Sequence, residues 1–242
     1  MRPPLRSAIA LAALVVLSMP LAACTGTTSS TATSSTTSAG AAPASGTVSA
    51  VDLLARLRVA APDYSVPYDR ARFGYGEDFD PDGDGCWTRR EVLIRDHVGP
   101  LRVFGTCSLD GTWRSLYDGA VWTDQRRLEV DHLVPLGEAW HAGAWTWSPA
   151  RLIAFGNDLD YRWGLQAVTA AVNQDKENKD PARWLPPENR CAYVKGWIGV
   201  KARWGLTVDR AEKAVLEEVL AGCRDPQVER PGTPDVARLA GL

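Results

Sequence analysis

The strongest constraint on the fold is a succession of two strand-like segments and one polar helical segment. The apolar run from Val130 to Leu136 contains Asp131 and His132, and a second predicted strand covers residues 165–170. A polar helix is predicted to begin at Asn173. Neighbouring strand side chains point to opposite faces, so Asp131 and His132 can serve one site only where the strand ends or twists. The pattern predicts a strand–strand–helix unit carrying an acid, an imidazole and an amide.

These residue types suit the hydrolysis of a phosphodiester, which needs an activated water and positive charge for the transition state. His132 can take a proton from water near neutral pH. A hard divalent cation held by oxygens of Asp131 and Asn173 can supply the charge while keeping several waters. The alternatives are an ordinary strand histidine bonded to Asp131 or to a backbone carbonyl, and a helix N-cap at Asn173.

The first 23 residues have the features of an export signal. Arg2 and Arg6 precede an apolar stretch at residues 8–19 that is short for a membrane span. The segment Leu21-Ala22-Ala23-Cys24 resembles a bacterial lipobox, which predicts cleavage before Cys24 and lipid on its sulfur. A plain signal peptide cut near Ala23 is the alternative.

The rest of the chain divides by composition. Residues 24–50, with the lipidated cysteine and many Ser, Thr and Ala residues, are expected to form a flexible tether. Residues 51–225 are expected to form one folded domain, and the Pro-rich residues 226–242 a loose tail. We expect a monomer whose contact with a membrane is through the lipid anchor alone, on the outer face of the cell membrane; full secretion is the alternative.

Cysteine usage fits an oxidising compartment. With Cys24 set aside, four cysteines remain: Cys86, Cys107, Cys191 and Cys223. They suggest two disulfides, for which three connectivities exist, and we favour Cys86–Cys107 with Cys191–Cys223 because each pair closes a local unit. A structural zinc site is disfavoured, since the chain has no Cys-x-x-Cys pair.

The charge balance argues against a tight, sequence-specific DNA-binding protein. Loss of Arg2 and Arg6 with the signal leaves 25 basic and 29 acidic side chains, a net charge of −4 with histidines neutral. Local basic groups remain beside the motif, at Arg126-Arg127 and at Lys176, Lys179 and Arg183. Weak, transient contact with a polyanion fits this balance better.

Local patterns predict the other elements. Helices are expected at residues 51–59 and 88–96, the second with a capping box of Thr88 and Glu91. Short strands separated by turns at Asp110-Gly111 and Asp118-Gly119 are expected between 101 and 135. Two helices close the domain, the first ending at Gly205 and the second beginning near Asp209.

Together with the motif, several segments resemble a known family. They are Asp84 to Arg89, Leu116-Tyr117-Asp118-Gly119, Asp131 to Trp140, Asn157-Asp158, Asn173-x-x-Lys176 and Asp180 to Pro186. The set resembles the HNH (ββα-metal) endonucleases, and more closely the exported branch of the domain found at the C-terminus of GmrSD-type restriction enzymes. The resemblance covers residues 73–223.

This resemblance implies an α+β fold with a ββα-metal (HNH, or His-Me finger) core, added helices and short strands. It implies that Asp131 and Asn173 hold Mg²⁺, Mn²⁺ or a similar ion, and that His132 is the general base. Lys176 and Lys179, near the start of the motif helix, and Arg127 are then expected to contact substrate phosphates.

One position departs from the family pattern. Many HNH motifs have an asparagine at the start of the second strand, where it orients the catalytic histidine, and this chain has Gly164. The resemblance makes Asn157 the candidate that replaces this amide as a catalytic residue.

A second ion site is suggested by the loop Asp80-Pro81-Asp82-Gly83-Asp84-Gly85 followed by Glu91. It fits the calcium-loop signature, with acids at positions 1, 3, 5 and 12 and glycine at 6. The alternative is an Asp/Gly turn clamped by the Cys86 disulfide.

The expected function is that of an exported, metal-dependent nuclease that hydrolyses DNA, or also RNA, with low sequence specificity. The rival expectation is a non-catalytic, Ca²⁺-stabilised surface lipoprotein with a decayed HNH site. A third is a hydrolase of another extracellular polymer.

Overall fold

The computed structural model describes residues 46–74, 79–80 and 83–242. The expected signal, Cys24, most of the tether and Asp82 lie outside the described residues. These described residues belong to one compact unit. The described part is a mixture of helices and short strands, which confirms an α+β fold.

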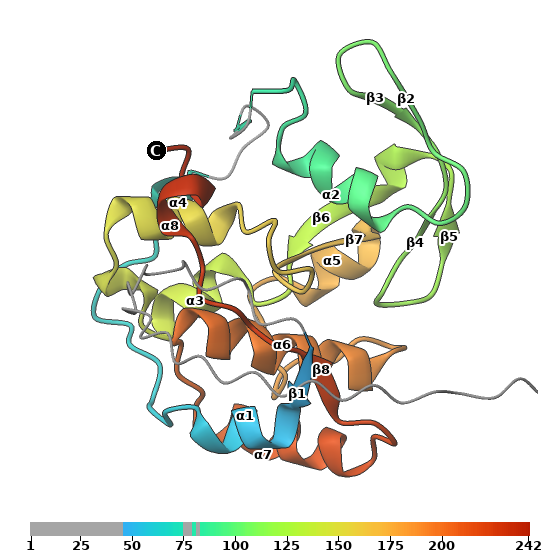
Figure 1. The fold of residues 1–242 in the computed structure, drawn as a ribbon. Helices are drawn as coiled ribbons and strands as arrows, with labels where there is room; N and C mark the ends of the chain where they lie inside the picture. Colours follow the sequence, from blue (N-terminus) through green and yellow to red (C-terminus); the bar gives the residue numbers. More distant parts are fainter. Residues whose placement is uncertain (1–45, 75–78, 81–82) are drawn as a thin grey trace, which may run out of the picture. The chain divides into compact units, whose positions relative to one another are not determined.

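The predicted strand–strand–helix unit is present. Strand β6 (Leu128–His132) pairs antiparallel with β7 (Leu165–Thr169), and α5 (Ala170–Lys176) follows directly (Figure 1). The helix therefore begins before Asn173, so the expectation that it starts at that residue is wrong. Asn173 lies in the middle of α5 and Lys176 at its end, because Thr169 already ends the strand.

The two faces of this strand pair meet different surroundings. Leu128, Leu165 and Ala167 pack with Val92 and Leu93 of α2 (Thr88–Asp96) in a smaller apolar core. Val168, which alternates with them, belongs to the larger core. The pair is thus covered by α2 on one face, while α5 contacts both strands beside the larger core (Figure 1).

The connection from β6 to β7 carries helices of its own. It forms α3 (Leu136–His141), the 3-10 turn η3 (Ala144–Thr146) and α4 (Pro149–Gly156). Aromatic side chains of α4 and of α6 (Arg190–Trp204) interlock in the larger core, where the rings of Phe155 and Trp204 meet edge to face at 5.4 Å. This packing positions the end of α4 beside β6.

The remaining strands form small antiparallel pairs. They are β1 (Thr47–Ser49) with β8 (Gln227–Glu229), β2 (Arg102–Phe104) with β3 (Ser108–Asp110), and β4 (Trp113–Arg114) with β5 (Val121–Trp122). Asp118-Gly119 lies between β4 and β5 as expected, whereas Asp110-Gly111 follows β3. The β2–β3 turn is made instead at residues 105–107, where Gly105 and Cys107 have positive φ.

Both favoured disulfides are present. Cys86 is bonded to Cys107 and Cys191 to Cys223, with Cα–Cα distances of 5.3 and 5.8 Å. The first ties the start of α2 to the β2–β3 turn, and the second ties α6 to the end of α7 (Arg210–Ala221).

Three local expectations are wrong. Residues 226–242 are not a loose tail: β8 pairs with β1, and α8 (Val236–Leu239) packs beside α4 with Leu239 buried (Figure 1). Strand β1 lies within the expected tether, so the folded unit extends beyond both ends of 51–225. The first helix, α1 (Ala50–Arg56), ends before Val59.

The capping box expected at Thr88 is also absent. The residue that precedes α2 is Trp87, and Thr88 is already helical. The Thr88 hydroxyl instead donates a 2.8 Å hydrogen bond to Asn157. In contrast, α6 ends at Gly205 with positive φ and α7 begins directly after Asp209, as the patterns predicted. Asp209 and Glu212 form a capping box there.

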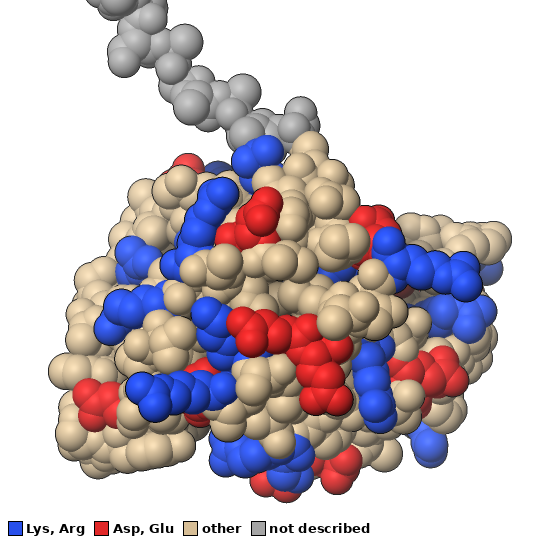
Figure 2. Space-filling model, turned by 90° about the horizontal axis from the view of Figure 1, so that it is seen from below, with Lys and Arg blue, Asp and Glu red and all other residues tan. Residues whose placement is uncertain are grey.

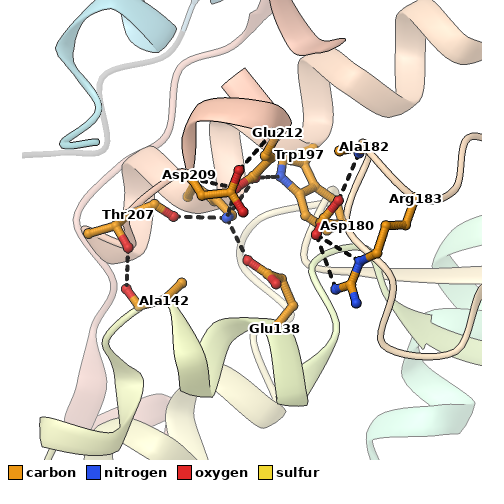
Figure 3. A network of polar contacts seen from close by, with 10 residues as sticks. Glu138, Ala142, Asp180, Ala182, Arg183, Trp197, Thr207, Asp209 and Glu212 are labelled. Atoms are coloured by element: carbon orange, nitrogen blue, oxygen red, sulfur yellow. Dashed lines mark hydrogen bonds and ion pairs between the residues drawn. The ribbon is translucent and has the colours of Figure 1, made fainter. Parts of the chain in front are cut away.

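A buried charged cluster joins α3, α6 and α7. The Lys201 ammonium is fully buried and donates to Glu138 at 2.8 Å, to the Thr207 carbonyl at 2.8 Å and to Glu212 (Figure 3). Trp197 also donates to Glu212. Two carboxylates around one ammonium leave a surplus negative charge, and burial together with nearby Glu138 raises the pKa of Glu212 to about 7 despite Lys201.

Glu212→Gln is expected to flatten the pH dependence of stability. The Glu212 pKa is about 7 in the folded protein against an ordinary value of 4.5, so between these values only the folded state holds the proton. Unfolding then releases a proton, and this group's contribution falls by up to about 1.4 kcal/mol per pH unit as pH rises from 4.5 to 7. Urea unfolding of the wild type and the variant between pH 4.5 and 7 measures this contribution. Equal slopes of the free energy of unfolding against pH for the two proteins would contradict the prediction.

Candidate functional site

His132 is held at the end of β6 by a backbone carbonyl. Its Nε2 lies 2.9 Å from the carbonyl oxygen of Gly156, the last residue of α4, and its ring stacks on Phe155 with centroids 6.1 Å apart. A carbonyl can only accept, so Nε2 carries the hydrogen and the lone pair lies on Nδ1. Burial, with smaller effects of Arg70 and Lys176, lowers the pKa of His132 to about 3, so the imidazole is neutral at neutral pH.

Asp131 faces a buried ammonium and a phenol. Its Oδ2 accepts from Lys176 Nζ at 2.7 Å and from the hydroxyl of Tyr117. Lys176 also donates to the backbone oxygen of His132 at 3.0 Å. Burial raises the pKa of Asp131 and lowers that of Lys176, and their mutual contact opposes both shifts. No described residue donates a hydrogen bond to Oδ1.

The Lys176 side chain is fully buried, which differs from its expected contact with substrate phosphates. Because α5 begins before Asn173, Lys176 falls at the helix end and points back under β6. Its ammonium compensates Asp131 and cannot meet a polymer in solvent.

The Asn173 amide, expected to share a metal ion with Asp131, contacts the carboxylate of Glu129. Its Nδ2 donates to Glu129 Oε2 at 2.8 Å, and Gln174 donates to Glu129 Oε1 at 2.8 Å. Glu129 precedes Asp131 by two residues in β6, so both side chains lie on the same strand face. The oxygen donors on this face are therefore Asp131, Glu129 and the amide of Asn173.

The acid and the imidazole lie on opposite faces of β6. Asp131 meets α5 and Tyr117, whereas His132 meets the end of α4. Strand alternation explains this, since β6 stays paired with β7 through His132, opposite Leu165. The described contacts thus bring Asp131 together with Lys176 rather than with His132 or Asn173.

Asn157 does not orient His132 in the structure. It is fully buried, accepts from the Thr88 hydroxyl and donates to the Ile153 carbonyl at 3.0 Å. It joins α4 to α2, and the carbonyl of Gly156 beside it makes the contact to the imidazole. The sequence gives little sign of this contact, because every residue type has a backbone carbonyl that could accept the hydrogen bond.

Packing explains the glycine at position 164. A Cβ placed there would lie 3.0 Å from the Asp158 carbonyl oxygen and 3.3 Å from that of Tyr161. The segment is held firmly, because Asp158 forms a buried ion pair with Arg203 at 2.7 Å and accepts from Trp204. A side chain at this position therefore requires the backbone of Asp158 and Tyr161 to shift by a few tenths of an ångström.

Basic side chains near the site remain accessible. Arg127 is exposed, with its guanidinium 4.7 Å from the Trp122 ring centroid. Lys179 is partly exposed and donates to the Asp175 carbonyl. Arg70, in the 3-10 turn η1 (Arg70–Phe73), is exposed and close enough for its charge to lower the pKa of His132.

Sequence reasoning did not single out Tyr117, Glu129, Gly156 or Arg70. Tyr117 lies inside one of the segments shared with the family, and Glu129 has the alternate spacing from Asp131 that a strand face requires. These two features of the sequence could have identified Tyr117 and Glu129. Arg70 comes from a distant irregular segment and carries no such signal.

The expected calcium loop is described in part. The carboxylate of Asp80 accepts from the backbone of Gly83 and Gly85, both at 2.9 Å, as in an Asp/Gly turn. Among the described residues, one group of side chains could in principle hold a metal ion. It consists of Asp84, Cys86 and Glu91, whose possible ligand atoms all lie within 4.8 Å of one another. The Cys86 sulfur is in a disulfide, so it offers no thiolate to an ion.

Comparison with known proteins gives a family. A family model described as the C-terminal domain of GmrSD restriction endonucleases matches residues 105–219. An "uncharacterized secreted protein" of Arthroderma benhamiae is 42% identical over 141 residues, which cover 57% of this chain and 68% of that protein. The chain belongs to the GmrSD C-terminal domain family. No solved structure matches it.

Membership of the GmrSD C-terminal domain family points to a nuclease-type hydrolase with a nucleic-acid substrate, and such nucleases generally depend on a divalent metal. The matched residues include β6, β7 and α5, and with them Asp131, His132 and Asn173. Among the described residues, no helix has the length and apolar character needed to cross a bilayer. The secreted description belongs to the relative.

Lys176→Met is expected to destabilise the domain by about 3–5 kcal/mol, because Asp131 would remain buried without its compensating charge. Urea unfolding at pH 7 measures the change. Lys179→Met is the matched control, since that side chain is partly exposed and its removal should cost less than about 0.5 kcal/mol. Equal losses for the two variants would refute a special role for the buried pair.

Gly164→Asn is expected to weaken the domain by about 1–3 kcal/mol rather than improve its chemistry, because the new side chain meets two backbone carbonyls. Thermal unfolding and nucleic-acid cleavage are measured together. Faster cleavage with unchanged stability would show that the family asparagine can be restored here.

Proposed function

We propose that this domain is an exported, divalent-metal-dependent endonuclease that hydrolyses phosphodiester bonds of DNA, and also of RNA, with low sequence preference. The observation that carries the proposal is the restrained, neutral His132 at the end of β6 within a β6–β7–α5 unit. In this proposal β6, β7 and α5 are the ββα-metal core.

The oxygen donors on the face of β6 opposite to His132 suit a hard divalent ion. Asp131, Asn173 and Glu129 offer carboxylate and amide oxygens on one face of the core, the ligands that Mg²⁺ and Mn²⁺ prefer. Asp131 would bind through Oδ1, since both of its donors take Oδ2. When bound, the metal would stabilise charge on the phosphate in the transition state.

His132 supplies the proton acceptor in this scheme. The Gly156 carbonyl keeps the hydrogen on Nε2, so Nδ1 receives the proton of the attacking water. Burial keeps the ring neutral before the reaction. Arg70 beside it, with Arg127 and Lys179 farther out, would hold substrate phosphates by charge.

Mixed surface charge favours low specificity. Acidic and basic side chains are interspersed over the face in Figure 2, which views the molecule from below the orientation of Figure 1. Such a surface supports weak contact with the polymer and little sequence reading. The proposed setting is outside the cell, with a monomer tethered through lipid on Cys24. Foreign DNA or nutrient nucleic acid would be available there.

His132→Ala is expected to reduce nicking of supercoiled plasmid by about 100-fold or more, because a positioned general base contributes roughly 10²–10⁴-fold. The wild-type exported chain is assayed with Mg²⁺, Mn²⁺ or EDTA. His97→Ala is the matched control: His97 contacts the Ile94 carbonyl at the end of α2, outside the proposed site, and this variant should retain activity.

Cleavage that requires metal and survives in His132→Ala would refute the assigned base. Absence of cleavage by the wild type with every metal would refute the nuclease and favour a non-catalytic surface protein. Equal loss in both histidine variants would indicate damage to the fold.

A further inference from the structure

A polar hollow lies at the start of β6, at the opposite end of that strand from His132. Its volume is about 420 Å³, and its walls come from α2, β3 and the segment before β6. The lining residues are Arg89, Arg90, Ser108, Leu109, Thr123, Asp124, Gln125 and Arg126. Nothing in the proposed chemistry at His132 uses this hollow.

The charge and hydrogen-bonding groups of this hollow favour an anion. Among the described residues, the lining contains three arginines and one carboxylate, that of Asp124, which pairs with Arg126 at 3.0 Å. Ser108 and Thr123 add hydroxyl groups to the lining. The surplus positive charge and the number of donors suit the several acceptor oxygens of a phosphate group.

One arginine that lines the hollow has a donor without a partner among the described residues. The Nε of Arg90 is buried and makes no hydrogen bond, although the same guanidinium donates through Nη1 to Gln125. A buried unpaired donor on a charged group costs free energy, typically about 1–3 kcal/mol or more.

The walls of the hollow are already fixed. The Gln125 side chain accepts from Arg90 and donates to the Leu109 carbonyl, and Arg89 donates to the backbone oxygens of Gln125 and Leu128 at 3.2 Å. Arg90 also lies over the Trp87 ring, 5.2 Å from its centroid. Prearranged side chains lose little conformational freedom on binding, which favours affinity.

The position along β6 relates the hollow to the catalytic histidine. Leu128 follows the lining segment and His132 ends the same strand, so the strand alone separates them by roughly 13 Å at about 3.3 Å per residue. At about 3.4 Å per nucleotide step, a stacked strand covers this distance in about four steps. A polymer reacting at His132 is thus long enough to reach the hollow.

From these observations we propose that the hollow is a phosphate subsite, which binds a backbone phosphodiester of the substrate a few nucleotides from the scissile bond. The inference rests on the proposed nuclease function for its substrate. Arg90 and Arg126 provide the principal contacts, and the site reads no base. It increases affinity for a polymer over a short fragment.

The test measures binding separately from cleavage. Fluorescence anisotropy with a labelled 12-nucleotide DNA lacking terminal phosphates is recorded in EDTA over a range of salt concentrations. Arg126→Met and Arg90→Met should each weaken binding about 5–10-fold and reduce the salt slope by about 0.7, the value for one lost phosphate contact on a single strand. Arg126 is highly exposed, so its loss should not unfold the domain.

Arg102→Met is the matched control, because it removes the same charge from an exposed arginine on the β2–β3 hairpin. Its salt slope should stay unchanged. An equal effect of all three substitutions would overturn the subsite, as would unchanged binding in the two pocket variants. Competition by millimolar inorganic phosphate that abolishes the difference between wild type and Arg126→Met supports a phosphate site.

Two further results separate this inference from the nuclease proposal. Binding that depends on Arg90 and Arg126 in a protein that never cleaves would retain the subsite and refute the nuclease. Metal-dependent cleavage with unaltered binding in both pocket variants would retain the nuclease and refute the subsite. Binding only when the DNA carries a terminal phosphate would overturn the backbone assignment.

Discussion

The buried contact between Lys176 and Asp131 holds the central unit of this domain together. It ties the end of α5 to β6, and its second hydrogen bond reaches the backbone of His132. Removing two charges from water is costly, so the pair is favourable only because its geometry is good and further donors, such as Tyr117, complete it. Asp131 therefore has a structural role in this domain.

This arrangement divides the candidate centre between two supports. The acid is held by α5 and Tyr117, whereas the imidazole is held by the end of α4 through the Gly156 carbonyl. The α4 end is in turn fixed by Asn157, which bonds to α2, and by the packing of α4 against α6. The orientation of the His132 imidazole thus depends on helix packing and not on a neighbouring side chain.

Much of the framework was predictable because its signals are local. The extent of α2, the glycine end of α6, the capping box of α7 and the order β6, β7, α5 depend on residues close together in the chain. The disulfides were predictable because each closes a local unit. The prediction of a loose tail was wrong because β8 and α8 are short. Their stability comes from contacts with β1 and α4, which are distant in the sequence and therefore absent from any local pattern.

By itself, the sequence determined the family, the presence of His132 at a strand end and the types of oxygen donor near it. Only the tertiary structure decided that Lys176 neutralises Asp131, that Asn173 meets Glu129, and that a backbone carbonyl orients the imidazole. The physical reason is that burial and long-range hydrogen bonds depend on how separate helices pack. The same lysine could lie in solvent or under a strand, and a difference of three residues in where α5 begins decides between them.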